Sequence, residues 1–225
     1  LMGVPVKFIW THDAFRVGED GPTHEPVEQE AQIRLMEKLQ NHKGQDSVRV
    51  FRPADADETT VCWAMAMENT DTPTALILSR QGIAKLPAGN NYEEARKGAY
   101  IVAGSDENPD VILVASGSEV STLESGCEAL RRDGIKVRVV SAPSEGLFRR
   151  QSAEYQEAVL PYNVKKFGMT AGLPCTLEGL VGIGPNSKVF GMKSFGFSAP
   201  YKVLDEKLGY TGENVYNQVK EFLNR

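Results

Sequence analysis

DVILVASGSEVSTLESGCEALRRDGIKVRVV, residues 110–140, is the stretch that decides the fold. It opens with the apolar run Asp110–Ala115, which predicts a buried strand, and it closes with the β-branched run Ile135–Val140, which predicts another. Between them, Ser118–Arg132 has the length of a helix, and the Asp133-Gly134 pair that follows suits a left-handed helix cap. A strand, a helix and a strand in this order form a βαβ unit, which predicts a largely parallel sheet.

Outward from this unit, short β-branched runs alternate with amphipathic stretches of helical length. Further strands are predicted at Val4–Trp10, Val48–Phe51, Thr74–Leu78 and Ala99–Ala103. Further helices are predicted at Glu25–Leu39, Asp57–Glu68, Ala199–Leu208 (stopped by Gly209) and Glu213–Leu223 (capped by Thr211). This alternation is typical of the α/β class.

The helix predicted at Glu25–Leu39 has apolar residues at helical spacing. They are Val27, Ala31, Leu35 and Leu39, with charged residues at the positions between them. We expect these four side chains to form one buried face of the helix.

The chain is predicted to hold two domains. Residues 80–97 contain several Gly, Pro and Asn residues and no sustained apolar period, so we predict a linker at 81–98 between domains at 1–80 and 99–225. The first domain has only three predicted strands, whereas a doubly wound domain normally has about five or six. We therefore interpret residues 1–80 as the back end of an interrupted domain with an exposed sheet edge.

Composition and charge exclude several protein classes. The 225 residues are 41% hydrophobic and 24% charged, which is typical of a globular protein and not of a disordered chain. A formal net charge of −5 disfavours nucleic acid as a partner. The longest apolar runs are far shorter than the roughly 18 residues of a membrane span, so no membrane association is predicted.

The cysteines and the first residues indicate the compartment. Cys62, Cys127 and Cys175 are odd in number and far apart, so neither a disulfide framework nor a CxxC metal site is indicated. We expect all three to be small buried residues. Residues 1–10 have no basic leader or cleavage site, and we predict a cytoplasmic protein.

The most informative polar stretch is THDAFRVGEDGPTHEPVEQ, residues 11–29, directly after the first predicted strand. It holds two of the chain's three histidines, His12 and His24. In open α/β sheets ligands bind at the carboxyl ends of the strands, where histidine and aspartate offer hydrogen bonds and proton transfer. Asp20 and His24 are candidates to face one pocket. The alternative is that the histidines only cap turns and that Gly21-Pro22 only shapes one.

The residues at this sheet edge could form a metal site or an anion site. His12, Asp20 and His24 are possible ligand types, but they lack the spacings of common structural zinc sites, and we predict no metal site. Arg80 follows the strand Thr74–Leu78 and is expected at the same edge as the histidines. Its guanidinium suits bidentate capture of a phosphate or carboxylate, and the alternative is a surface salt bridge.

These residues resemble a known family. The motifs are HD at His12-Asp13, GEDGPTHEPVEQ at Gly18–Gln29, RPAD at Arg52–Asp55, LSRQ at Leu78–Gln81 and ASGSEV at Ala115–Val120. In this order they resemble transketolase from the first strand to the C-terminal domain. Related thiamine enzymes share the Gly-Glu-Asp-Gly core but not its Thr-His-Asp and His-Glu-Pro-Val-Glu-Gln flanks.

The resemblance implies a reaction and roles for four residues. Transketolases use thiamine diphosphate and Mg²⁺ to move a two-carbon ketol unit from a ketose phosphate to an aldose phosphate in the pentose phosphate pathway. By motif position, His24 matches a catalytic histidine near the donor hydroxyls and the aminopyrimidine. Asp20 matches a residue that binds a donor hydroxyl, and His12 and Arg80 match groups that hold the sugar phosphate. No cofactor-binding residue is assigned, and Arg52, Asp55 and Glu119 are interpreted as structural.

The resemblance also indicates what this chain lacks. The family's N-terminal domain with its magnesium ligands, and the upstream part of its pyrimidine-binding domain with the activating glutamate, have no counterpart here. The predicted fold is therefore a truncated pyrimidine-binding domain followed by a smaller, mostly parallel α/β C-terminal domain. We expect the full enzyme to be a homodimer acting on sugar phosphates, and the isolated chain to be inactive with no cofactor bound.

Two alternatives stay open at this point. One is another thiamine enzyme, a deoxyxylulose-phosphate synthase or a 2-oxoacid dehydrogenase component, which the flanks of the Gly-Glu-Asp-Gly core disfavour. The other is a non-catalytic interaction module, which the missing cofactor elements favour. The stretch Val164–Pro174 departs from the family pattern, whereas Ser194–Pro200 resembles it again.

Overall fold

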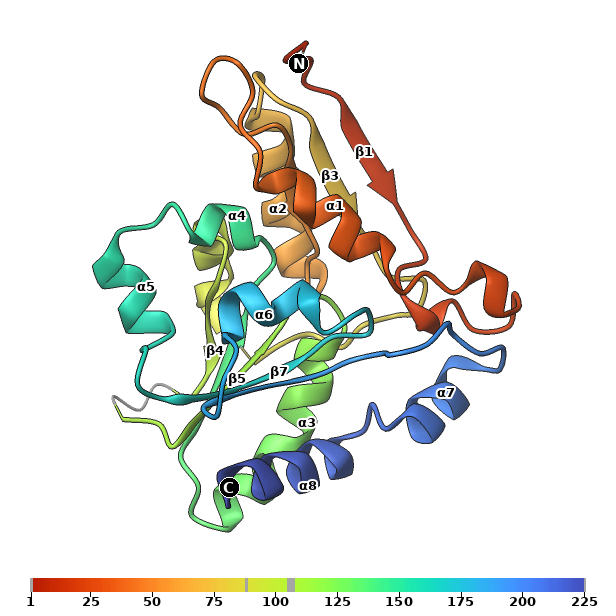
Figure 1. Ribbon diagram of the computed structural model, residues 1–225, viewed down its shortest axis with the longest axis vertical. Helices are drawn as coiled ribbons and strands as arrows, with labels where there is room; N and C mark the ends of the chain where they lie inside the picture. Colours follow the sequence, from red (N-terminus) through yellow and green to blue (C-terminus); the bar gives the residue numbers. More distant parts are fainter. Residues whose placement is uncertain (1, 88, 105–107, 225) are drawn as a thin grey trace.

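The computed structural model describes residues 2–87, 89–104 and 108–224 (Figure 1). Two β-sheets, each with helices packed on it, lie one after the other along the long axis of the molecule. The chain starts at one end of this axis and finishes at the other (Figure 1). None of the helices in these ranges is long and apolar enough to cross a membrane.

The first sheet has three parallel strands in the order β1-β3-β2. They are β1 (Lys7–Trp10), β2 (Arg49–Phe51) and β3 (Thr74–Ile77). Helices α1 (Gln29–Glu37) and α2 (Ala56–Glu68) pack with them, and Asp55 caps α2 by accepting a hydrogen bond from the Glu58 amide. β1 lies at the edge of the sheet, and Phe8, Ile9 and Trp10 on it are exposed.

The second sheet has five strands in the order β4-β6-β5-β7-β8. They are β4 (Tyr100–Ala103), β5 (Val111–Ala115), β6 (Val137–Ser141), β7 (Lys165–Met169) and β8 (Ser187–Phe190). β4 runs antiparallel to β6, and the other three pairs are parallel. The predicted α/β class with a mostly parallel second sheet is confirmed, and β5, α3 and β6 form the predicted βαβ unit.

Helices cover both faces of the second sheet. They are α3 (Glu119–Arg132), α4 (Glu145–Phe148), α5 (Ala153–Val159), α6 (Cys175–Val181) and α8 (Gly212–Leu223). Helix α7 (Tyr201–Leu208) packs instead against residues 15–17. Along β5, Val111 and Leu113 belong to the cluster that includes α3 and α8, whereas Ile112 and Val114 belong to the cluster formed with α4 to α6. β5 is therefore buried on both faces, which explains its uninterrupted apolar run.

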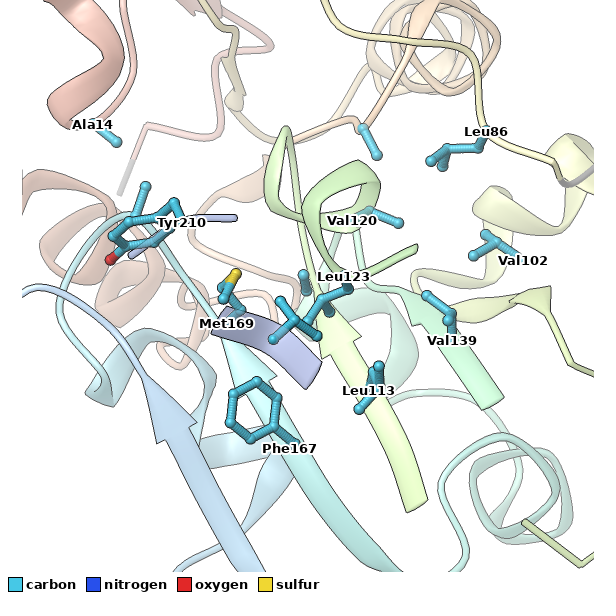
Figure 2. Packing of buried hydrophobic residues seen from close by; sticks show 14 of the residues in the cluster. Ala14, Leu86, Val102, Leu113, Val120, Leu123, Val139, Phe167, Met169 and Tyr210 are labelled. Carbon is cyan, nitrogen blue, oxygen red and sulfur yellow. The ribbon is translucent and has the colours of Figure 1, made fainter. Parts of the chain in front are cut away.

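One hydrophobic core joins the two sheets. It contains Phe51 and Leu76 from the first sheet together with Leu113 and Phe167 from the second. Figure 2 shows members of this core from both parts of the chain. The two predicted domains thus share apolar packing, while their boundaries at residues 80 and 99 stay predictions.

The buried face expected on the first helix is wrong for two of its four residues, although Val27 is buried as expected. Leu35 and Leu39 are 64% and 62% exposed, whereas Arg34 is buried. The Arg34 Nε atom donates to Glu30 at 2.8 Å, and Nη1 lies 3.8 Å from Glu37. These ion pairs offset the burial of the Arg34 charge, although its Nη1 and Nη2 atoms make no hydrogen bond within the described structure. Leu35 and Leu39 are left facing solvent.

One further expectation needs correction. Cys175 is exposed at the start of α6, although Cys62 and Cys127 are buried as expected. The predicted linker contains a 3₁₀ helix, η3 (Gly89–Lys97), which packs against α2. Two short apolar side chains, Leu86 and Ala95, are buried there, and they are too few to give a sequence period.

Candidate functional site

The candidate site lies where β1 and β3 end side by side. The Leu78 amide donates to the Trp10 carbonyl at 2.7 Å, and the Asp13 amide donates to the Leu78 carbonyl at 3.1 Å. The segments that follow the two strands, residues 11–29 and 79–81, therefore leave the same edge of the sheet. This arrangement follows from the parallel pairing of β1 with β3.

A segment from the far end of the chain closes over the loop at residues 11–29. The Ala199 amide donates to the Gly18 carbonyl at 3.0 Å, and the Gly21 amide donates to the Ser198 hydroxyl at 3.2 Å. Gly18 and Gly21 have φ values of 97° and 94°, which glycine adopts without strain. The loop contains two 3₁₀ turns, η1 (Phe15–Val17) and η2 (Pro22–His24). The stretch Ser194–Pro200 therefore forms part of this region.

Arg80 lies against the loop with most of its guanidinium uncommitted. Its Nη1 atom donates to the Val17 carbonyl at 2.9 Å, and the side chain is exposed. Within residues 2–87, 89–104 and 108–224 no carboxylate lies within 4 Å of it to form an ion pair. The surface salt bridge considered above is thus not formed, and the fork remains available to an anion.

The two loop histidines are exposed and bonded locally. His12 Nδ1 lies 2.8 Å from the Thr11 hydroxyl, and His24 Nδ1 lies 3.1 Å from the Thr23 hydroxyl. Among the residues that the structure describes, neither imidazole makes a hydrogen bond with Asp20 or Arg80. All four predicted side chains are on the surface, with Asp20 and Arg80 gathered near Glu25.

Glu25 is a residue of this loop that could not be singled out from the sequence. It is 4% exposed, and its Oε1 atom accepts from the Gly18 amide at 3.1 Å, while its buried Oε2 atom has no partner in the described structure. Burial raises the pKa of this carboxyl to about 7; the Gly18 hydrogen bond opposes the shift, Asp20 adds to it and Arg80 opposes it. A glutamate in a polar loop carries no sequence signal of burial.

His12 also borders a cavity of about 530 Å³ beside α1. The cavity is lined by Trp10, Thr11, His12, Asp13, Ala14, Pro26, Val27, Gln29, Glu30, Gln32, Ile33, Met36, Ile77 and Gly172. Most of this lining is apolar, and it includes neither Asp20 nor His24 nor Arg80. His12 therefore borders this cavity, whereas Asp20 and His24, later in the same loop, and Arg80, in the neighbouring segment, do not.

Beneath the loop lies a buried cluster of charges that joins the two sheets. Arg16 donates to Glu119 at 2.6 Å and to Asp205 at 2.7 Å. Arg52 donates to the same Glu119 carboxylate at 2.5 Å and pairs with Asp13. The interpretation of Arg52 and Glu119 as structural agrees with this burial.

A cofactor diphosphate with Mg²⁺ makes chemical demands on its site. Such a site needs several oxygen ligands close together or a cluster of cations. Within the described ranges no three His, Cys, Asp or Glu side chains come together in a way that could hold a metal ion. The residues that the structure describes therefore offer no set of ligands for Mg²⁺.

Nearly the whole chain matches known proteins of one family. Residues 1–85 match the model of the transketolase pyrimidine-binding domain, and residues 98–211 match that of the transketolase-like C-terminal domain. A transketolase of Staphylococcus aureus is 43% identical over 222 residues, which is 97% of this chain and 32% of that protein.

Solved structures give the same result. A Pichia stipitis transketolase in complex with sedoheptulose 7-phosphate superposes with a TM-score of 0.85 at 32% identity, over 99% of this chain and 30% of that one. A Leishmania mexicana transketolase superposes with a TM-score of 0.84 at 39% identity, over 96% of this chain and 30% of that one. The chain spans about a third of the length of these relatives.

Proposed function

The chain belongs to the transketolase family, and on that premise we propose that it is the C-terminal portion of an enzyme that moves a two-carbon ketol unit between sugar phosphates. The donor is a ketose phosphate and the acceptor an aldose phosphate, as in the pentose phosphate pathway. The observation that supports this most strongly is Arg80, an exposed guanidinium with no carboxylate partner in the described structure, beside the loop that carries both histidines.

The proposal gives each residue of the edge a role. Arg80 and His12 bind the phosphate of the sugar, because a guanidinium and an imidazole both donate to phosphate oxygens. Asp20 accepts a hydrogen bond from a donor hydroxyl. His24 lies in the same loop and donates or accepts a proton at a hydroxyl oxygen of the donor. The Pichia stipitis relative with bound sedoheptulose 7-phosphate supports a sugar phosphate as the ligand.

The cofactor belongs to the whole enzyme in this proposal. Thiamine diphosphate, when bound, supplies the carbanion stabilisation that breaking a carbon–carbon bond next to a carbonyl requires. We expect the residues that hold its diphosphate and Mg²⁺ to lie outside these 225 residues. We further propose a homodimeric, cytoplasmic enzyme.

An assay of the full-length enzyme tests the proposed function. With xylulose 5-phosphate and ribose 5-phosphate as substrates, the expected products are glyceraldehyde 3-phosphate and sedoheptulose 7-phosphate. His42 is exposed in a different loop, so His42→Ala should leave this activity unchanged. It serves as the matched control for replacing a histidine of the candidate site. Absence of these products from a folded, cofactor-loaded enzyme would reject the proposed function.

A further inference from the structure

The backbone on both sides of Asp13 is in conformations that residues other than glycine rarely adopt. His12 has a φ of 67° and Ala14 a φ of 55°. Such conformations persist only where the surroundings hold them in place. Asp13, between them, is buried, and its amide donates to the Leu78 carbonyl at 3.1 Å. Asp13 is therefore the anchor of the turn that presents His12.

Arg52 holds the Asp13 side chain from below. Its Nε atom donates to Asp13 Oδ2 at 2.8 Å, and its Nη2 atom lies 2.6 Å from the same oxygen. The guanidinium has little room to move, since a Cβ atom on Gly117 would lie 2.6 Å from its Cζ atom. Arg52 follows β2 directly, so the first sheet supplies both partners of this ion pair.

Glu119, in the first turn of α3, holds the other side of Arg52. Its Oε2 atom accepts from Arg52 Nη1 at 2.5 Å and from the Ala171 amide at 3.1 Å, while Oε1 accepts from Arg16 at 2.6 Å. Burial alone would raise the pKa of Glu119, but Arg52 and Arg16 lower it below its usual value. The buried carboxylate is charged, and it fixes Arg52 from the second sheet.

We propose that Glu119, acting through Arg52 and Asp13, is a positioning residue that holds the His12 imidazole in place for the substrate phosphate. The proposal rests on the proposed function, which assigns His12 to that phosphate. Glu119 itself touches no substrate. The second sheet thereby contributes to a site whose binding residues lie at the edge of the first.

Nuclear magnetic resonance on the 225-residue chain tests the structural part directly. Backbone ¹³C shifts of His12 report its left-handed conformation, and with three histidines in the chain its ring signals can be assigned. In Glu119→Gln we expect the left-handed signature of His12 to be lost and its ring signals to shift. If Glu119→Gln unfolds, the same signals are measured in Glu119→Asp, which keeps the charge but has a shorter side chain. The same changes in the His12 signals are expected.

Glu58→Gln is the matched control, because Glu58 is also fully buried and contacts none of these residues. It should leave the His12 signals unchanged. An unchanged His12 in a folded Glu119 variant would overturn the proposal.

A double-mutant cycle in the full-length enzyme tests the functional part. His12→Ala and Glu119→Gln should each raise the KM for phosphorylated donors several-fold, and the double variant should be no worse than His12→Ala alone. Independent effects that multiply would contradict action through His12. If His12→Ala does not distinguish phosphorylated from unphosphorylated donors, the role of His12 in the proposed function fails, while the resonance experiment still decides whether Glu119 positions it.

Discussion

Arg80 lies three residues beyond β3, and within the described structure its side chain makes a single hydrogen bond, from Nη1 to the Val17 carbonyl. Lysine keeps the charge but loses the bidentate fork. We predict that Arg80→Lys in the full-length enzyme raises the KM for phosphorylated donors about tenfold, since one charge-assisted hydrogen bond is worth about 1.5 kcal/mol. Unphosphorylated donors should be little affected, and Arg132→Lys, at another exposed arginine, should change neither. Equal effects on both donor types would remove the phosphate role.

His24 and Asp20 are exposed, so their replacement costs little packing. We predict that His24→Ala and Asp20→Ala lower turnover or donor discrimination at least tenfold in the full-length enzyme, with cofactor affinity largely intact. Steady-state kinetics and thermal unfolding are measured together, with His42→Ala as the control. A loss of stability large enough to explain the lost activity would return both residues to a purely structural role.

Single residues were predictable to different degrees. His12, Asp20, His24 and Arg80 could be placed at one edge, because polar residues that follow parallel strands meet there. The burial of Glu25 could not be predicted, because the segment that covers it comes from residues 194–200. The link from Asp13 through Arg52 to Glu119 joins positions 39 and 67 residues apart, and only the folded chain brings them together.

Helix α2 contains the buried Glu58, which accepts hydrogen bonds from the Ala54 amide and the Tyr100 hydroxyl. Burial raises its pKa to about 7, although these hydrogen bonds oppose the shift. Between pH 4.5, the usual value, and 7 the folded state keeps a proton that the unfolded state has lost, so stability falls as the pH rises.

We therefore predict that titration of Glu58 lowers the free energy of unfolding of the parent chain by up to about 3 kcal/mol between pH 5 and 8, and that Glu58→Gln removes this decline. Urea titrations of the 225-residue chain at several pH values measure this dependence. The variant should gain stability relative to the parent chain as the pH rises. A parallel decline in both proteins would show that Glu58 is not the group that titrates.

Strand β1 offers an unpaired edge and the stacked rings of Phe8 and Trp10, whose centroids are 5.5 Å apart. Such an edge is a template for pairing with another chain. We predict that the 225-residue chain self-associates and that Ile9→Lys on this strand makes it monomeric in sedimentation velocity. Ile183→Lys, at an apolar residue that is 87% exposed elsewhere, is the control and should not. A parent chain that stays monomeric at high concentration would contradict the prediction.

Elements were predictable where one local pattern dominates. The strands with β-branched runs could be predicted, because a strand that is buried on both faces has a continuous apolar sequence. Strand β7 was not predicted, because it begins with two lysines. Lys166 is tolerated in the buried strand because its ammonium donates to the Pro161 carbonyl at 2.5 Å. The buried face of α1 was predicted incorrectly, because helical spacing shows which apolar side chains share one face but not whether another part of the protein packs against that face.

At the scale of the whole molecule, the two sheets pack together beneath the candidate site. A continuous core and the charges shared by Arg16, Arg52 and Glu119 join them. We propose a division in which the substrate-binding residues are in this chain and the cofactor-binding residues are in the part of the enzyme outside it.

Calorimetric titration of the 225-residue chain with thiamine diphosphate and Mg²⁺, paired with an assay on xylulose 5-phosphate and ribose 5-phosphate, tests the division most directly. We predict no strong binding and no turnover, because a chain with a net charge of −5 has little to hold a diphosphate without the missing ligands. The full-length enzyme, measured alongside, should bind and turn over. Micromolar binding or measurable turnover by the isolated chain would contradict the proposal that the cofactor-binding residues lie outside it.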